Sequence, residues 1–425
     1  MSSRIRSFDR SVQLLLINQL TINTGFYMLM PYLAGHLATD LGMAAWTIGL
    51  VLGVRNLSQQ GLFLVGGTLA DRLGYKPVIV AGCALRTGGF ALLGVVDALP
   101  ALLVASAATG FAGALFNPAV RAYLAQDAAD RRLEAFAVFN VFCQAGILGG
   151  PLIGLALMAT GAFRMVCLVA AMIFAVLTVV QLRWLPPRRP VAVPASTILA
   201  DWRVVIGNRS FVLFSMAMAG SCVLSFQIYL LLPLMLQRQM GGQVGGALGG
   251  VSLIFTVSAI TAIAGQLRIT DAARRRWDGP AAMTRGVLIM AGSFLPLAGY
   301  GLAGPEVAGP AVLLAAVVLC TLLLTIGTAL SYPFEMDTVV NLSRGGLVAT
   351  HYGLYNTVAG IGIAAGNLLG GALLDASGEG PVPWIALSVL GGICGWAVRR
   401  LATAGRLSTD ERGPTVHTAL AQRRT

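Results

Sequence analysis

Twelve apolar segments, each about as long as a membrane-spanning helix, divide this chain of 425 residues. A helix needs about 20 apolar residues to cross the hydrocarbon core of a bilayer. Only 11% of the residues are charged, against about 25% in a soluble domain, so the sequence predicts an all-α integral membrane protein. The predicted spans are residues 12–36, 46–70, 77–96, 99–125, 134–160, 162–185, 210–237, 245–270, 282–303, 307–342, 349–375 and 382–402.

The basic residues indicate how the chain lies in the membrane. The arginines and the single lysine cluster in every second connection between apolar segments, as they do in cytoplasmic loops. Both termini are therefore expected in the cytoplasm, in a multi-pass protein of the plasma (inner) membrane. The net charge of +12 does not indicate a nucleic-acid partner, because the cations are not gathered on one face. The expected partner is the lipid bilayer.

A stretch rich in proline and arginine, residues 186–209, separates six spans from six. We expect it to be a cytoplasmic linker between an N-terminal six-helix bundle of residues 1–185 and a C-terminal six-helix bundle of residues 210–402. The polar tail over residues 403–425 is expected to be disordered.

The two halves also resemble each other. The sequence Leu-Phe-Asn-Pro at 115–118 corresponds to Leu-Ser-Tyr-Pro at 330–333, and glycines spaced by four recur at 146–154 and 362–370. These matches occur in the same order in both halves. The pattern predicts two pseudo-symmetric six-helix bundles.

Several classes of function lack their motifs in this sequence. The only lysine, Lys76, precedes Pro77, so the phosphate-binding pattern GxxxxGK[ST] is absent. The six cysteines lie inside apolar segments, without the spacing of zinc ligands. We expect no catalytic residue, no metal, no cofactor and no enzyme activity. Transport powered by an ion gradient fits better.

A charged hinge, residues 67–77, joins the second and third spans. A glycine there lets two helix ends approach closely, and charged side chains can bind a neighbouring helix end. The pattern G-x-x-x-D-R-x-G-x-K resembles the loop between helices 2 and 3 of the major facilitator superfamily. The resemblance implies two bundles around a substrate site at the midplane. It also implies a gating role for Gly67, Asp71, Arg72, Gly74 and Lys76.

The same resemblance implies a cytoplasmic charge cluster. In it, Asp71 and Arg72 would join Arg121 and Glu134 to steady the outward-facing state, with Asp71 facing the start of the span 349–375. The alternative is that these are solvated loop charges.

The fifth span carries a motif of glycines spaced by four with one proline. Such glycines let another helix pack closely, and the proline favours a bend. The motif resembles that of the drug:proton antiporter branch of the superfamily, and residues 53–61 and 85–90 resemble MdtH-type twelve-helix multidrug exporters. One departure is Ser106, where the branch often has an arginine thought to assist proton transfer. Plain helix packing is the alternative role for the motif residues Gly146, Gly150, Pro151 and Gly154.

Arg55 and Arg86 lie near the middle or in the outer half of predicted spans, where an unpaired charge costs several kcal/mol. At 1.5 Å per residue, Arg86 lies about 15 Å from Lys76, and Arg55 lies about 24 Å from Asp71. Either they bind an anionic or carbonyl-bearing substrate, or they are tied to helix carbonyls and nearby amides.

Two acids, Glu335 and Asp337, lie inside the tenth span. A desolvated carboxylate there could take up and release a proton during a transport cycle. The alternative is a gating ion pair, for instance between Glu335 and Arg121. Both acids are candidates for proton coupling.

Polar side chains on the inner helix faces are candidates for the lining of a substrate cavity. Residues four apart share a helix face, and three such pairs occur in the first half. Long apolar side chains between them suit a poorly selective, amphipathic ligand. The predicted lining is Asn23, Tyr27, Arg55, Gln59, Arg86, Asn117, Asn140, Gln144, Gln227, Tyr332 and Asn356.

Together these features predict a secondary transporter, expected as a monomer, that couples protons to the efflux of drug-like amphipathic small molecules by alternating access. Two alternatives stay open. One is a dedicated transporter of a single metabolite, such as a sugar, siderophore or natural product. The other is a non-transporting membrane sensor or scaffold.

Overall fold

The computed structural model describes residues 2–160, 163–190, 197–240, 244–377 and 380–407. Within these ranges most residues are helical and no β-strand occurs. A helix satisfies its own backbone hydrogen bonds, as a chain must where no water reaches it. The predicted all-α fold is confirmed.

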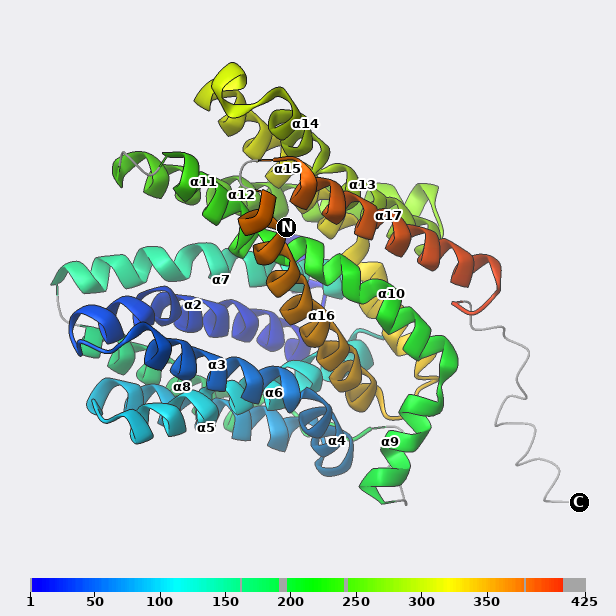
Figure 1. The fold of residues 1–425 in the computed structure, drawn as a ribbon. Coiled ribbons are helices and arrows are strands. Elements are labelled where there is room, and N and C mark those ends of the chain that lie inside the picture. Colours follow the sequence, from blue (N-terminus) through cyan, green and yellow to red (C-terminus); the bar gives the residue numbers. More distant parts are fainter. Residues whose placement is uncertain (1, 161–162, 191–196, 241–243, 378–379, 408–425) are drawn as a thin grey trace, which may run out of the picture.

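The helices of the first half lie side by side with roughly parallel axes (Figure 1). The second predicted span is a bent pair, whose two parts differ in direction by 45°. The elements are α1 (Ser2–Arg6), α2 (Arg10–Thr39), the bent pair α3 (Ala45–Gly61) and α4 (Phe63–Leu73), α5 (Tyr75–Val95), α6 (Leu99–Ala128), η1 (Ala129–Arg131), α7 (Arg132–Thr160) and α8 (Phe163–Trp184).

The second half contains two further broken spans. Pro233 and Pro296 explain the breaks, because a proline ring clashes with the carbonyl four residues earlier. Those carbonyls belong to Tyr229 and Gly292, where the preceding helices end. The elements are α10 (Arg209–Phe226), η2 (Gln227–Tyr229), α11 (Leu231–Met240), α12 (Val244–Arg276), α13 (Gly279–Gly292), α14 (Leu295–Ala303), α15 (Pro305–Leu342), α16 (Val348–Ser377) and α17 (Val382–Thr403).

Each of the twelve predicted spans coincides with one helix or one broken helix. By length and composition, nine helical stretches of the described residues could cross a membrane, or ten if the α3–α4 pair counts as one span. One of the nine, Leu99–Ala159, contains both α6 and α7. The helix α2 is not among them, and it carries the polar residues Asn18, Gln19 and Asn23.

The predicted linker is partly helical. Its helix α9 (Ile198–Gly207) is capped by Thr197, whose side chain accepts a hydrogen bond from the Ala200 amide. Asp201 in α9 pairs with Arg72 at 2.6 Å, so the linker packs against the hinge. Residues 191–196 lie outside the described residues, as does the predicted disordered tail from 408 onward. The predicted domain boundaries stay a prediction.

The two halves meet along α16, which lies between α4 and α10, and along α7, which faces α12 and α15 (Figure 1). We name the end of the bundle that carries residues 67–77 the hinge face. Near it, Arg4 pairs with Asp271 at 2.8 Å and Arg132 with Asp337 at 3.1 Å, each bond joining one half to the other. These contacts close the hinge face.

Small residues let α2 and α7 pack closely. A Cβ atom on Gly146 would lie 2.6 Å from the Leu20 carbonyl oxygen, and one on Gly150 would lie 2.8 Å from that of Thr24. A Cβ on Gly154 would overlap the Met28 carbonyl. The glycines of the fifth-span motif therefore form a helix-packing face against α2.

We expect Gly154→Ala to lower the melting temperature of the purified protein by several degrees. The added methyl group must push α7 away from α2, and overpacking of this kind costs about 1–3 kcal/mol. Gly149→Ala is the matched control, because a Cβ there meets nothing within 4 Å and alanine favours a helix. Equal melting temperatures for the two variants would contradict the close packing.

Candidate functional site

A cavity of about 290 Å³ lies between the two halves. The helices α3, α4 and α6 line it from the first half, and α10, α13, α15 and α16 line it from the second. Its lining brings together six residues that the sequence singled out: Gln59, Asn117, Arg121, Tyr332, Glu335 and Asn356.

Arg121 and Glu335 carry the charges of this lining. The Arg121 guanidinium donates to the Asn356 side chain at 2.8 Å, a bond that joins α6 to α16. The Glu335 side chain is 6% exposed and accepts a hydrogen bond from the Tyr355 hydroxyl. Arg121 acts electrostatically on Glu335, but in the described part of the chain the two form no direct ion pair. The cavity thus places a guanidinium and a carboxylate on opposite halves.

Pro333 shapes the second-half wall of the site. It lacks an amide hydrogen, so the Ala329 carbonyl, four residues earlier, loses its helical partner. The Gln266 side chain donates to that carbonyl at 2.8 Å and accepts from Asn140 at 2.7 Å. One chain of hydrogen bonds therefore connects α15, α12 and α7.

A smaller cavity of about 140 Å³ lies next to the central one. Two predicted residues, Asn140 and Gln144, line it. The two cavities share Ser225, Phe226 and Thr328, so they are neighbouring parts of one hollow region between the halves.

Two predicted lining residues are bonded within their own half. Asn23 donates to the Cys143 sulfur at 3.0 Å, between α2 and α7. Gln227 is fully buried and donates to the Val223 carbonyl at 2.7 Å. The structure places neither of them in the lining of the central cavity.

Three further predicted residues lie beside the cavity rather than in its lining. Arg55 lies one helical turn farther from the hinge face than Gln59, to which it donates a hydrogen bond at 3.3 Å. Tyr27 lies near Tyr229 of the other half. Arg86 is buried inside the first half.

Asp71 binds the start of α16. Its carboxylate accepts from the amides of Ala349 and Thr350, at 3.1 and 2.7 Å, and from the Thr350 hydroxyl at 2.7 Å. A carboxylate at a helix N-terminus meets unpaired amides and the positive end of the helix dipole. Gly67 permits the approach, because a Cβ there would overlap the Ala349 carbonyl.

The four charges expected in one cluster lie instead in separate pairs. Arg72 pairs with Asp201, Glu134 with Arg131 at 2.9 Å, and Arg121 with Asn356 in the cavity. Arg72 differs from the expectation because α9, which the sequence indicated only as linker, brings its own acid, Asp201, to the hinge.

The remaining hinge and coupling residues lie at the hinge face. Gly74 has φ 91°, a left-handed conformation that favours glycine, and Lys76 lies in the first turn of α5. Asp337 pairs with Arg132 and accepts from Asn341 at 3.0 Å. Of the two candidate coupling acids, the central cavity contains Glu335.

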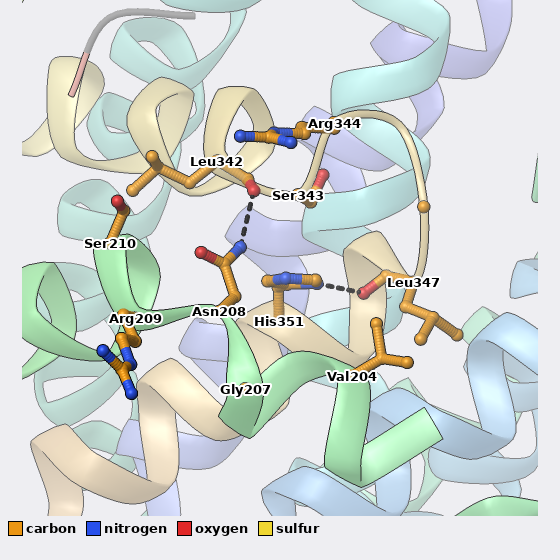
Figure 2. Close-up of a pocket in the computed structure, with 11 residues that line it drawn as sticks. Val204, Gly207, Asn208, Arg209, Ser210, Leu342, Ser343, Arg344, Leu347 and His351 are labelled. Carbon is orange, nitrogen blue, oxygen red and sulfur yellow. Dashed lines mark hydrogen bonds between the residues drawn. The ribbon is translucent and has the colours of Figure 1, made fainter. Parts of the chain in front are cut away.

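A larger hollow of about 570 Å³ lies at the hinge face, between α9, α10 and the connection from α15 to α16 (Figure 2). Asn208 donates to the Leu342 carbonyl at 2.9 Å, and His351 contacts the Leu347 carbonyl at 2.8 Å. None of the residues predicted as a site lines it. The central cavity is the better candidate, because it lies between the halves and carries opposite charges.

Sequence reasoning missed three residues that shape the site: Thr350, Tyr355 and Gln266. A lone glutamine in an apolar span is a visible signal, and Gln266 could have been found by it. Tyr355 and Thr350 resemble ordinary packing residues, and their roles depend on helices far away in the sequence.

Comparison with known proteins gives a consistent result. The model of the Major Facilitator Superfamily matches residues 15–366. An uncharacterized MFS-type transporter of Mycobacterium tuberculosis is 51% identical over 402 residues, covering 94% of both chains. The multidrug resistance protein MdtH of Salmonella arizonae is 28% identical over 383 residues, covering 89% of this chain and 90% of its own.

Two solved structures share the fold. The human organic anion transporter MFSD10 has a TM-score of 0.68 at 17% identity, over 92% of this chain and 99% of its own. The fucose:proton symporter FucP of E. coli has a TM-score of 0.71 at 14% identity, over 92% and 98%. These relatives are transporters and not enzymes. The family match spans most of the chain, and the chain therefore belongs to the Major Facilitator Superfamily, as a multi-pass membrane transporter.

Proposed function

We propose that this protein exports drug-like amphipathic small molecules in exchange for protons, by alternating access to the cavity between its halves. The observation that carries the proposal is Glu335, a buried carboxylate in a cavity that both halves line. The resemblance to MdtH multidrug resistance proteins supports the class of substrate.

The hinge face is proposed to be cytoplasmic, since its connections carry most of the basic residues. The protein would then be a monomer of the plasma (inner) membrane. The conformation of this structure would be the one that is closed to the cytoplasm. Asp71 holds this closure by binding α16 from the other half. Opening would release that bond and separate Gly67 from Ala349.

The proton is proposed to act at Glu335. When Glu335 is ionised, its negative charge attracts Arg121 across the cavity. When Glu335 is protonated, it can donate a hydrogen bond of its own, and Arg121 keeps its hydrogen bond to Asn356. Protonation therefore changes the attraction between α6 and α15. A change of this kind favours one of two arrangements of the halves.

A second candidate is a dedicated transporter of one polar metabolite. The amide side chains of Gln59, Asn117 and Asn356 in the lining favour it, because several hydrogen-bonding groups can select one ligand. A drug-susceptibility panel in a pump-deficient host separates the two, since only broad export raises tolerance to unrelated compounds.

Efflux of a fluorescent dye from preloaded cells that express the protein should stop when a protonophore is added. Proton coupling predicts this because the gradient is the energy source. The control is a host that lacks the protein, treated identically. Continued efflux from protonophore-treated cells would remove the proton from the mechanism.

Glu335→Gln should flatten the dependence of the transport rate on pH, since glutamine keeps the shape of the neutral acid but cannot exchange a proton. The matched control is Asp337→Asn on the same helix, whose carboxylate pairs with Arg132 outside the cavity. That control should keep the wild-type shape of the profile. A wild-type profile in Glu335→Gln would move the coupling site elsewhere.

Asp71→Asn should reduce transport about tenfold or more while the amount of protein in the membrane stays constant. Asparagine has no negative charge to interact with the N-terminus of α16, and it offers that helix one acceptor oxygen where aspartate offers two. The control is Asp97→Asn, an exposed acid between α5 and α6. Full activity of Asp71→Asn would defeat the gating role.

A further inference from the structure

Arg86 is a buried cation, and among the residues that the structure describes it has no hydrogen-bond or ion-pair partner. Its side chain, inside the first half, is 6% exposed, and its Nε atom is fully buried without an acceptor. In the described part of the chain its guanidinium meets aromatic rings instead, 5.3 Å from the centres of both Phe26 and Phe174. Gly25 allows this, because a Cβ there would lie 3.0 Å from the Phe174 ring.

A second cation shares one of these rings. The Arg55 guanidinium lies 5.1 Å from the centre of Phe26, and it donates to the neutral amides of Asn56 and Gln59. Two groups act electrostatically on Arg86: the thiol of Cys83 and the positive charge of Arg55. The structure thus gathers two like charges around Phe26.

The acids within the helices are engaged elsewhere. Asp71 binds the start of α16, Asp337 pairs with Arg132, and Glu335 is bound by Tyr355. Attraction to an aromatic ring is weaker than the penalty for burying an unpaired cation in a membrane. Among the described residues no acid therefore pairs with either arginine, although burial in a membrane favours an anionic partner for each.

The pair adjoins the central cavity. Gln59 lines that cavity and also bonds to Arg55. On α6, a Cβ at Gly113 would lie 2.9 Å from Arg86 Nη2 and 3.1 Å from Gln59 Cδ, so both side chains meet at this glycine. Gln59 therefore connects the lining of the cavity to the two guanidinium groups.

We propose that Arg55 and Arg86 bind the carboxylate or sulfonate of an anionic amphipathic substrate, whose apolar body occupies the central cavity. The planar guanidinium offers paired N–H groups that match the two oxygens of such an anion. This inference rests on the proposed transport function and narrows its substrates: anionic amphiphiles are preferred, and cationic ones are repelled.

The test uses the purified full-length protein and two probes with the same apolar body, dansyl-phenylalanine and its methyl ester, of which only the first carries an ionised carboxylate. Equilibrium binding to the wild type should favour the free carboxylate by tenfold or more. Arg86→Gln and Arg55→Gln should remove that preference, and Arg86→Lys should retain part of it. Arg183→Gln, which removes an exposed arginine of the same half, should leave the preference intact.

Melting temperatures separate binding from a structural role. The carboxylate probe should raise the melting temperature of the wild type and not that of Arg86→Gln. Gly113→Ala, which crowds Arg86 without changing its charge, should weaken carboxylate binding severalfold. Gly88→Ala on the helix of Arg86, where a Cβ meets nothing within 4 Å, should not.

Three results would overturn the inference: equal binding of acid and ester by the wild type, an unchanged preference in Arg86→Gln, or stabilisation by chloride that the carboxylate does not exceed. Because binding is measured without a gradient, failure of proton coupling leaves this test unaffected. Protonophore-sensitive export of neutral and cationic dyes alone would retain the proposed transport and reject the anion site.

Discussion

The interior of a membrane offers no water, so every buried polar group must find its partner within the protein. This constraint explains the contacts that join the two halves. The Asp71 carboxylate accepts hydrogen bonds from the amides that begin α16. Gln266 donates to the carbonyl that Pro333 leaves without a helical partner, and it accepts a hydrogen bond from Asn140 of the other half. Each bond crosses between helices that are distant in sequence. The halves are therefore connected where the backbone cannot satisfy itself.

Glycine and proline control where these contacts form. Gly67 lets α4 reach the first turn of α16, and Gly146, Gly150 and Gly154 let α7 lie directly on α2. The first is at the contact between the halves, and the other three are within one half. The contact between α4 and α16, which one carboxylate holds, can separate more readily than the long packing contact between α2 and α7. This difference suits a protein whose bundles stay intact while the contact between them changes.

The central cavity combines opposite charges at a distance from one another. Glu335 is bound by Tyr355 from its own half, whereas Arg121 bonds to Asn356 in the other half. Arg55 and Arg86 lie beside the same cavity, around Phe26. A proton at Glu335 and an anionic group at the arginines would thus act at different places. Coupling between them would pass through the relative position of the halves, not through direct contact.

Hydropathy and helix spacing are local properties of the chain, so the amino-acid sequence was enough to predict the helical membrane fold, the order of the spans and the hinge. It also indicated Gln59, Asn117, Tyr332 and Asn356 as cavity lining. Tertiary structure decided the partners. It placed Asn23 and Gln227 within their own halves, paired Arg72 with Asp201, and gave Asp71 the amides of Thr350. The partner of each side chain depends on how helices that are far apart in the sequence pack together. A local sequence pattern contains no information about that packing.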